Sequence, residues 1–266
     1  MNRSGRRAAF IFLLAVTAMW AFSPVAGGQS VSRATGTTII DVEGPRPLAD
    51  VIRELERRHG WVVTYEEVPY EYAGDLVDVA RSVRKYGDLS IPVLVPKGGR
   101  LSFAYPEPLP NGKNEEAVLQ DLLRQYRASG LPGEFGLARS GEIFHVIPRT
   151  SRNALGVEEG RHSALDARIS IPESERTVDE TLTAIELAIC TETGWAIAVG
   201  GPVWNLFLQS RLVAGADKES ARSVLLRTLH ATRRQVSWQL FCGPAGTANP
   251  LCAVNFNMVD RPPANR

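Results

Sequence analysis

Few residues of this sequence have the types and spacing that catalysis or metal binding requires. None of the four histidines lies three or four residues from another, the spacing that places two metal ligands on one helix face; they are His59, His145, His162 and His230. The chain contains no Gly-x-Ser-x-Gly elbow, no glycine-rich phosphate loop and no Cys-x-x-Cys pair. We therefore expect a protein without a metal, a cofactor or an enzymatic activity.

Two pairs of adjacent carboxylates come nearest to an acid–base site. They are Glu66-Glu67 and Glu158-Glu159. Successive side chains of a strand point to opposite faces, so two neighbours are poorly placed to work on one substrate. We therefore expect neither pair to act as an acid–base site.

Aromatic and acidic side chains gather between residues 68 and 99, a segment without helical or strand periodicity. The candidate binding residues there are Tyr70, Tyr72, Tyr86 and Asp75. A segment of this composition suits a binding loop. It equally suits a structural flap that covers part of the protein's own sheet, and the sequence leaves both interpretations open.

The first 27 residues have the order of a secretory signal peptide. Arg3, Arg6 and Arg7 precede an apolar run, residues 8–22, and small residues follow it. The run is shorter than the roughly 20 residues that span a bilayer. We expect cleavage between Ser23 and Gln29, export to the periplasm or the exterior, and no transmembrane segment afterwards. The mature chain then has 27 basic and 29 acidic residues, which excludes a generally basic surface for nucleic acid.

An exported chain meets oxidising conditions, in which suitably placed cysteines pair. Cys242 ends one apolar strand pattern and Cys252 begins the next, and opposing them also places Leu240 opposite Val254. This register predicts a disulfide between the two cysteines, with two buried thiols as the alternative. Cys190 lies in a helical pattern, and we expect it to be a small buried hydrophobe.

The elements that position these residues occur twice in the same order. The first unit is predicted to contain strand 37–43, a helix from residue 47 to Gly60, strands 61–65 and 101–105, a helix from residue 115 to Gly130, and strands 135–139 and 142–148. The second contains strand 165–172, a helix capped by Thr177 and Glu180 that ends at Gly194, a strand from Trp195, strand 206–213, a helix capped by Asp217, and strands 236–242 and 252–259.

The repeat predicts an α+β protein of two tandem small domains, each β-α-β followed by β-α-β-β. We place them at residues 36–150 and 164–260, joined by a polar linker, 151–163, and followed by a tail, 261–266. The first domain carries an insertion at about 68–99. Because each unit has the complete set of elements, we expect each to fold alone.

The apolar spacing of the first unit resembles that of the secretin and TonB N-terminus (STN) short domain. The resemblance rests on residues 39–52, 60–65, 114–123 and 143–148, and the second unit keeps the same order of elements. It implies a periplasmic protein-interaction module attached to an outer-membrane secretin or receptor barrel. The residues after Val259 are few and polar, so we expect only the interaction role to apply here.

These observations favour a non-enzymatic, exported module that recognises another cell-envelope protein, with a partner strand pairing against an exposed sheet edge. The alternative is a small-ligand or glycan binding protein that uses the insertion and the groove between the domains. An uncovered edge strand would favour the first function. A concave pocket walled by the insertion's tyrosines would favour the second.

Overall fold

The computed structural model describes residues 28–34, 36–83, 92–107, 114–200, 204–245 and 251–260. The chain has the predicted α+β fold. Its strands are β1 (Gln29–Ala34), β2 (Thr37–Gly44), β3 (Val62–Glu66), β4 (Leu76–Asp78), β5 (Leu94–Pro96), β6 (Gly99–Pro106), β7 (Glu134–Ser140), β8 (Ile143–Arg152), β9 (Glu158–Gly160), β10 (Arg168–Thr177), β11 (Ala196–Gly200), β12 (Arg211–Ser220), β13 (Val236–Cys242) and β14 (Leu251–Met258). Its helices are α1 (Pro47–His59), α2 (Ala80–Val83), α3 (Glu115–Ala128), α4 (Val178–Thr193), α5 (Trp204–Gln209) and α6 (Ala221–His230), and the 3-10 turns η2 (Ala73–Asp75) and η4 (Ala164–Asp166) complete the set.

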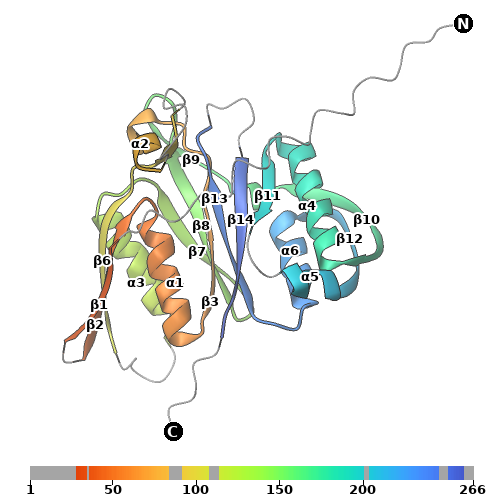
Figure 1. Ribbon diagram of the computed structural model, residues 1–266, viewed down its shortest axis with the longest axis horizontal. Helices are drawn as coiled ribbons and strands as arrows, with labels where there is room; N and C mark the ends of the chain where they lie inside the picture. Colours follow the sequence, from red (N-terminus) through yellow and green to blue (C-terminus); the bar gives the residue numbers. More distant parts are fainter. Residues whose placement is uncertain are drawn as a thin grey trace, which may run out of the picture.

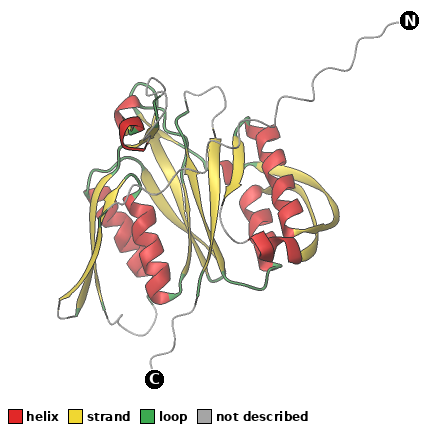
Figure 2. Ribbon diagram, in the orientation of Figure 1, coloured by secondary structure: helices red, strands yellow, loops and turns green. Residues whose placement is uncertain are grey.

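The elements form alternating layers of sheet and helix (Figures 1 and 2). A three-stranded outer sheet, β1-β2-β6, lies against α1 and α3, and a two-stranded outer sheet, β10-β12, lies beyond α4 and α6. Between the two helical layers runs a seven-stranded sheet in the order β11-β14-β13-β3-β8-β7, with β9 also paired to β8. The helices of the two units therefore cover opposite faces of one shared sheet.

Each unit has its own apolar core. The first core includes Ile40 and Phe103 of the outer sheet, Leu55 of α1 and Phe144 of β8. The second core is built in the same way around α4 and α6. Successive side chains of β13 point to opposite faces of the shared sheet, so this strand contributes to both cores. Trp238 and Leu240 belong to the second core, whereas Phe241 packs against the first.

The two units meet where β3 pairs with β13 in parallel, through Tyr65 opposite Gln239 and Glu66 opposite Leu240. We call this junction the seam. Its backbone pairing is short, and buried side chains extend it. Arg222 of α6 donates two hydrogen bonds to Glu66, at 2.8 and 2.6 Å, and Glu66 is 0% exposed.

On the other face of the seam, Arg46 donates to both carboxylate oxygens of Glu67, at 3.0 and 3.1 Å, and to the Cys242 carbonyl at 3.3 Å. Gln239 of β13 bridges the units as well, because its amide donates to the Ala49 carbonyl at 3.1 Å and accepts from Arg53 at 2.8 Å. Glu66 and Glu67 thus point to opposite faces of the strand, as their adjacency predicts.

Local signals in the sequence account for the ends of the main helices. Pro47 occupies the first turn of α1, and Gly60 ends it in the left-handed conformation, with φ of 67°. At α4, the Thr177 side chain accepts from the Glu180 backbone and the Glu180 side chain accepts from the Thr177 backbone, which is the predicted capping box.

The structure corrects two elements of the second unit. Residues 206–213 were expected to form a strand, but α5 extends to Gln209 and β12 begins only at Arg211. The strand then continues beyond Asp217, so Ser220 caps α6 by accepting from the Ser223 N–H at 3.2 Å. Short apolar runs suit both a helix and a strand, and this one is divided between the two.

The predicted hairpin and its disulfide are confirmed. In the β13–β14 register Cys242 lies opposite Cys252, Leu240 opposite Val254 and Trp238 opposite Phe256. The two cysteines form a disulfide, with their Cα atoms 4.0 Å apart. Cys190, in contrast, was expected to be buried and is an exposed free thiol. It lies in the last turns of α4, where the buried stripe passes through Ile189 instead.

Residues 151–163, predicted as a linker, are tied to the central sheet. β8 continues to Arg152, and β9 pairs back onto it through Thr150–Gly160, Ser151–Glu159 and Arg152–Glu158. No helix within the described ranges is long and apolar enough to cross a membrane. The predicted signal peptide and the tail from residue 261 lie outside those ranges.

Candidate functional site

The structure brings together three of the four predicted binding residues. Tyr70, Tyr72 and Asp75 lie within a few residues of one another between β3 and β4, and Tyr86 lies outside the described residues. Each of the three is engaged with another part of the molecule. These contacts decide whether the insertion behaves as a mobile binding loop or as an anchored flap.

Tyr70 fastens the insertion to the end of the β13–β14 hairpin. Its N–H donates to the Gly243 carbonyl at 3.4 Å, and its carbonyl accepts from the Ala245 N–H at 2.8 Å. Its hydroxyl donates to Glu67 at 3.3 Å. Burial, followed by the charge of Glu67, raises the pKa of Tyr70 well above its usual value, so the phenol stays protonated and serves as a donor.

Tyr72 and Asp75 fasten the insertion to β8. Arg152 donates to Asp75 from Nε at 3.0 Å and pairs with it a second time through Nη2. The same guanidinium lies over the Tyr72 ring, 5.0 Å from its centroid. Arg161, just beyond β9, pairs with Glu71 at 2.8 Å. The insertion is therefore held by charge-assisted contacts to the segment 151–163.

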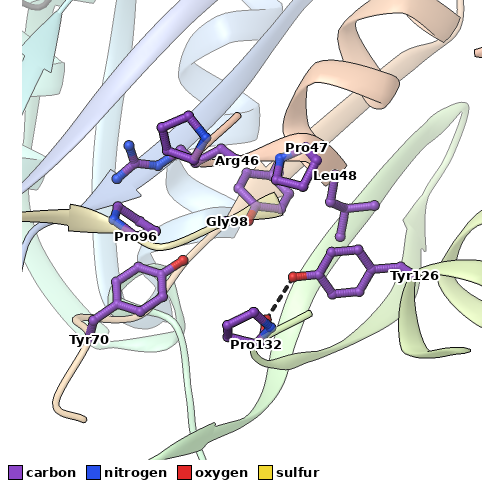
Figure 3. Close-up of a pocket in the computed structure, with 10 residues that line it drawn as sticks. Arg46, Pro47, Leu48, Tyr70, Pro96, Gly98, Tyr126 and Pro132 are labelled. Carbon is purple, nitrogen blue, oxygen red and sulfur yellow. Dashed lines mark hydrogen bonds between the residues drawn. The ribbon is translucent and has the colours of Figure 1, made fainter. Parts of the chain in front are cut away.

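Two small pockets border these contacts. Tyr70 and Pro132 line both, and the first is also lined by Arg46, Tyr65 and Tyr126, whose hydroxyl donates to the Pro132 carbonyl at 2.6 Å (Figure 3). The second pocket reaches Asp75, Thr150, Ser151 and Arg152. The enclosed space in each is about that of one water molecule.

The polar lining of the second pocket agrees with this size. The hydroxyls of Thr150 and Ser151 are buried without a partner in the described part of the chain. One bound water would satisfy such groups, and a sugar ring would not fit beside them. Among the described residues, these pockets therefore give no support to a glycan site at the insertion.

His145 and His59 each contact neighbouring side chains of the fold. His145 is buried in the central sheet, 2.8 Å from the Thr64 hydroxyl, and burial, followed by the charge of Arg222, lowers its pKa to about 4. His59 stacks on Trp61 at 4.5 Å and contacts the Tyr105 hydroxyl at 2.9 Å. In the described ranges no three histidine, cysteine or acidic side chains are grouped as a metal site requires.

The outermost strands of the sheets form the second kind of candidate site. Unpaired backbone groups at an edge can accept a strand from another protein, and proteins usually protect such edges. On β6, Gln125 of α3 donates to the Ala104 carbonyl at 3.0 Å and accepts from its N–H at 3.2 Å. On β11, the Val199 N–H donates to Glu186 of α4 at 2.8 Å. Both edges are thus occupied by side chains of their own unit.

The edge of β10 is irregular, and that of β7 is irregular at its first residue only. β10 contains Pro172, which lacks an N–H, and its pairing with β12 shifts register twice, between Ile169 and Ile171 and again before Ser174. β7 shifts register only between Glu134 and Phe135, and its remaining residues pair regularly with β8. Five of its seven residues are half-buried, so its edge is less accessible than an exposed strand. Prolines and bulges are devices that keep edge strands from pairing with other chains.

β1 has neither kind of protection among the described residues. It pairs with β2 in one unbroken register from Gln29–Val42 to Ala34–Thr37. It contains no proline, and the described side chains are exposed, including 37% of Val31. The side chain of Gln29 donates to Glu54 of α1 at 3.2 Å, but within the described chain no side chain bonds to the free backbone edge. Of the edges of β1, β6, β7, β10 and β11, that of β1 is therefore the most accessible regular one.

Sequence reasoning missed β1. Residues 29–34 are mostly small and polar and have no apolar face, so the periodicity that reveals half-buried strands is absent. The available signal was the two-residue spacing between this segment and the strand at 37, with Gly36 in the turn.

Comparison with known proteins gives no relative. No protein-family model, no curated protein and no solved structure matches this chain.

Proposed function

We propose that this chain is an exported, non-enzymatic interaction module of the cell envelope, which binds a partner protein by adding the partner's strand to β1. The observation that carries the proposal is the β1 edge, which is regular, exposed and uncapped in the described chain. The edges of β6 and β11 are capped, that of β10 is irregular, and β7 shifts register at its start and is mostly half-buried. The resemblance to the STN domain and the signal-like N-terminus support an interaction role in the envelope.

The insertion is the basis of the second candidate function, ligand or glycan binding. Its Tyr70 lines both pockets, but each pocket has room for about one water, and Tyr72 and Asp75 are engaged with Arg152. These contacts favour the flap over the binding loop. A strand-addition module is the function that the geometry supports better.

Site-specific cross-linking in cells tests the proposal. A photoreactive phenylalanine derivative replaces Ser32 on β1, and the matched control replaces Ser174, an exposed residue on the irregular β10 edge. We expect residue 32 to give an adduct with a distinct envelope protein and residue 174 to give none. Equal adducts from both positions, or none from residue 32, would contradict the proposal.

A further inference from the structure

The backbone of β1 determines which of its groups can bind another strand. The Glu43 N–H donates to the Gly28 carbonyl at 3.1 Å, so residues 28 and 43 form a hydrogen-bonded pair. Along an antiparallel pair of strands, hydrogen-bonded residue pairs alternate with non-hydrogen-bonded pairs. The backbone groups of residues 30, 32 and 34 therefore point toward β2, like those of residue 28. The N–H and C=O groups of Gln29, Val31 and Arg33 point outward, to the free edge.

This pattern is self-complementary. We propose that, when no partner strand is bound, β1 pairs antiparallel with β1 of a second copy of the chain, with Val31 opposite Val31. This inference rests on the proposed function, because it assigns an occupant to the same edge. The arrangement places Gln29 opposite Arg33 on each side, so all outward backbone groups meet in about six hydrogen bonds. The two outer sheets then form one sheet in the order β6-β2-β1-β1-β2-β6.

The side chains agree with the same register. Residues 29, 31 and 33 share one face of β1, so pairing buries the exposed Val31 against its copy. Arg33 of one copy lies opposite Gln29 of the other, whose side chain contacts Glu54 at 3.2 Å. A positive side chain thus approaches an acidic site, and no like charges oppose each other.

The size of the contact sets its strength. A pair of five-residue segments buries less surface than a stable protein interface, which usually buries about 1,200–2,000 Å² in total. The dimer is therefore weak and dissociates at micromolar concentration. Such a dimer covers an edge that would otherwise invite aggregation, and a partner strand can displace it.

A cysteine at the symmetry centre tests the pairing in the purified exported chain. The Val31→Cys variant is made with Cys190→Ser, because the exposed thiol of Cys190 would itself cross-link molecules. The control is Ser174→Cys on the β10 edge, again with Cys190→Ser. We expect mild oxidation to convert most of the first variant to a covalent dimer and little of the second. Equal cross-linking of the two variants would overturn the inference.

A second variant tests the register without a thiol. Val31→Pro removes an N–H that points outward, so the pairing of β1 with β2 keeps its hydrogen bonds. Val31→Thr is the matched control that keeps the N–H. In sedimentation at rising concentration we expect the Thr variant to dimerise and the Pro variant to remain monomeric with a similar melting temperature. Dimerisation of the Pro variant, or a wild-type chain that is monomeric throughout, would contradict the inference.

These results separate the two proposals. If the chain is monomeric but residue 32 still cross-links to another envelope protein in cells, the self-pairing is refuted and the proposed function stands. If the chain dimerises in vitro but gives no partner adduct in cells, the proposed function is refuted and the self-pairing stands.

Discussion

At the seam, a strand of one unit pairs with a strand of the other, and at the β1 edge a strand of another protein can pair. The two places are built differently. At the seam, β3 and β13 share two residue pairs, and the buried Glu66–Arg222 and Glu67–Arg46 contacts hold the junction. At the edge, β1 offers a longer regular backbone and no buried charge. At the seam, buried ion pairs stabilise a junction that has few backbone pairs. At β1, a longer run of backbone groups without buried charge suits a partner strand that binds and dissociates.

Removing one partner of the buried ion pair at the seam should have the largest effect on stability. Arg222→Ala leaves the carboxylate of Glu66 buried without its ion pair, which should cost about 3–5 kcal/mol of unfolding free energy. Urea denaturation measures the loss. The control is Arg211→Ala, which breaks the exposed pair with Glu175 and should cost less than about 1 kcal/mol. Equal losses would mean that the seam is no stronger than a surface contact.

Titration of a buried carboxyl of α1 should have the next largest effect on stability. Burial raises the pKa of Glu56 to about 7, against a hydrogen bond from the Val63 N–H at 3.1 Å. The proton is bound more tightly in the folded state, so this group's contribution is complete below the ordinary glutamate pKa and is lost as pH rises through 7.

The Glu56→Gln variant keeps an acceptor for Val63 and loses the titration. We expect its stability relative to wild type to rise between about pH 5 and pH 8, by up to about 3 kcal/mol. Glu186, whose pKa burial also raises to about 7, caps the β11 edge and is less buried, so Glu186→Gln should give a smaller rise. Stability curves of the variant and wild type that run parallel across this range would refute the assignment.

Removing the disulfide should have a smaller effect than breaking the seam charge. A variant with Cys242→Ala and Cys252→Ala releases the hairpin end that Tyr70 binds, and we expect a loss of about 2 kcal/mol. The thermal midpoint and the urea midpoint measure it. The control is Cys190→Ser, an exposed position that should change stability by no more than about 0.5 kcal/mol. A double variant as stable as this control would show that the hydrogen bonds alone hold the hairpin.

Restoring a backbone donor on β10 should have the smallest effect on stability. Pro172→Val returns an N–H to the irregular edge, and we expect a change within about 0.5 kcal/mol but more self-association. Light scattering at rising concentration measures it, with wild type as the reference. A variant that associates no more than wild type would mean that the register shifts, rather than the proline, protect this edge.

Much of the fold could be predicted from the sequence because its signals are local. The Thr177–Glu180 capping box, the Gly60 helix end and the Cys242–Cys252 register each depend on a few neighbouring residues. The seam could not be predicted, because Glu66 and Arg222 are 156 positions apart and no local pattern relates them. For the same reason the sequence suggested two separate domains. Their independent folding stays a prediction. Because charges are buried at the seam, its test should compare each fragment alone with the two fragments mixed.

The candidate site was predicted less well. The sequence pointed to Tyr70, Tyr72 and Asp75, which the structure does bring together, but it could not show that Arg152 engages Tyr72 and Asp75. Pocket size depends on packing between distant segments and leaves no trace in composition. β1 was missed because polar residues on an outer sheet carry no apolar period.

The strand order of the central sheet also determines whether molecules can polymerise. In each unit the three strands occur in the same order, β3-β8-β7 and β11-β14-β13, so the seam joins unlike strands and β7 and β11 remain at the ends. Such a heterologous junction, repeated between chains, builds a ring if its rotation closes and a fibre if it does not. The second residues after the helix caps Asn114 and Ser220 are Glu116 and Arg222, so the first unit has an acidic residue where the second has its partly buried arginine. Glu186 also binds the Val199 N–H, so the ends at β7 and β11 lack the charge pair and the open backbone that stabilise the seam.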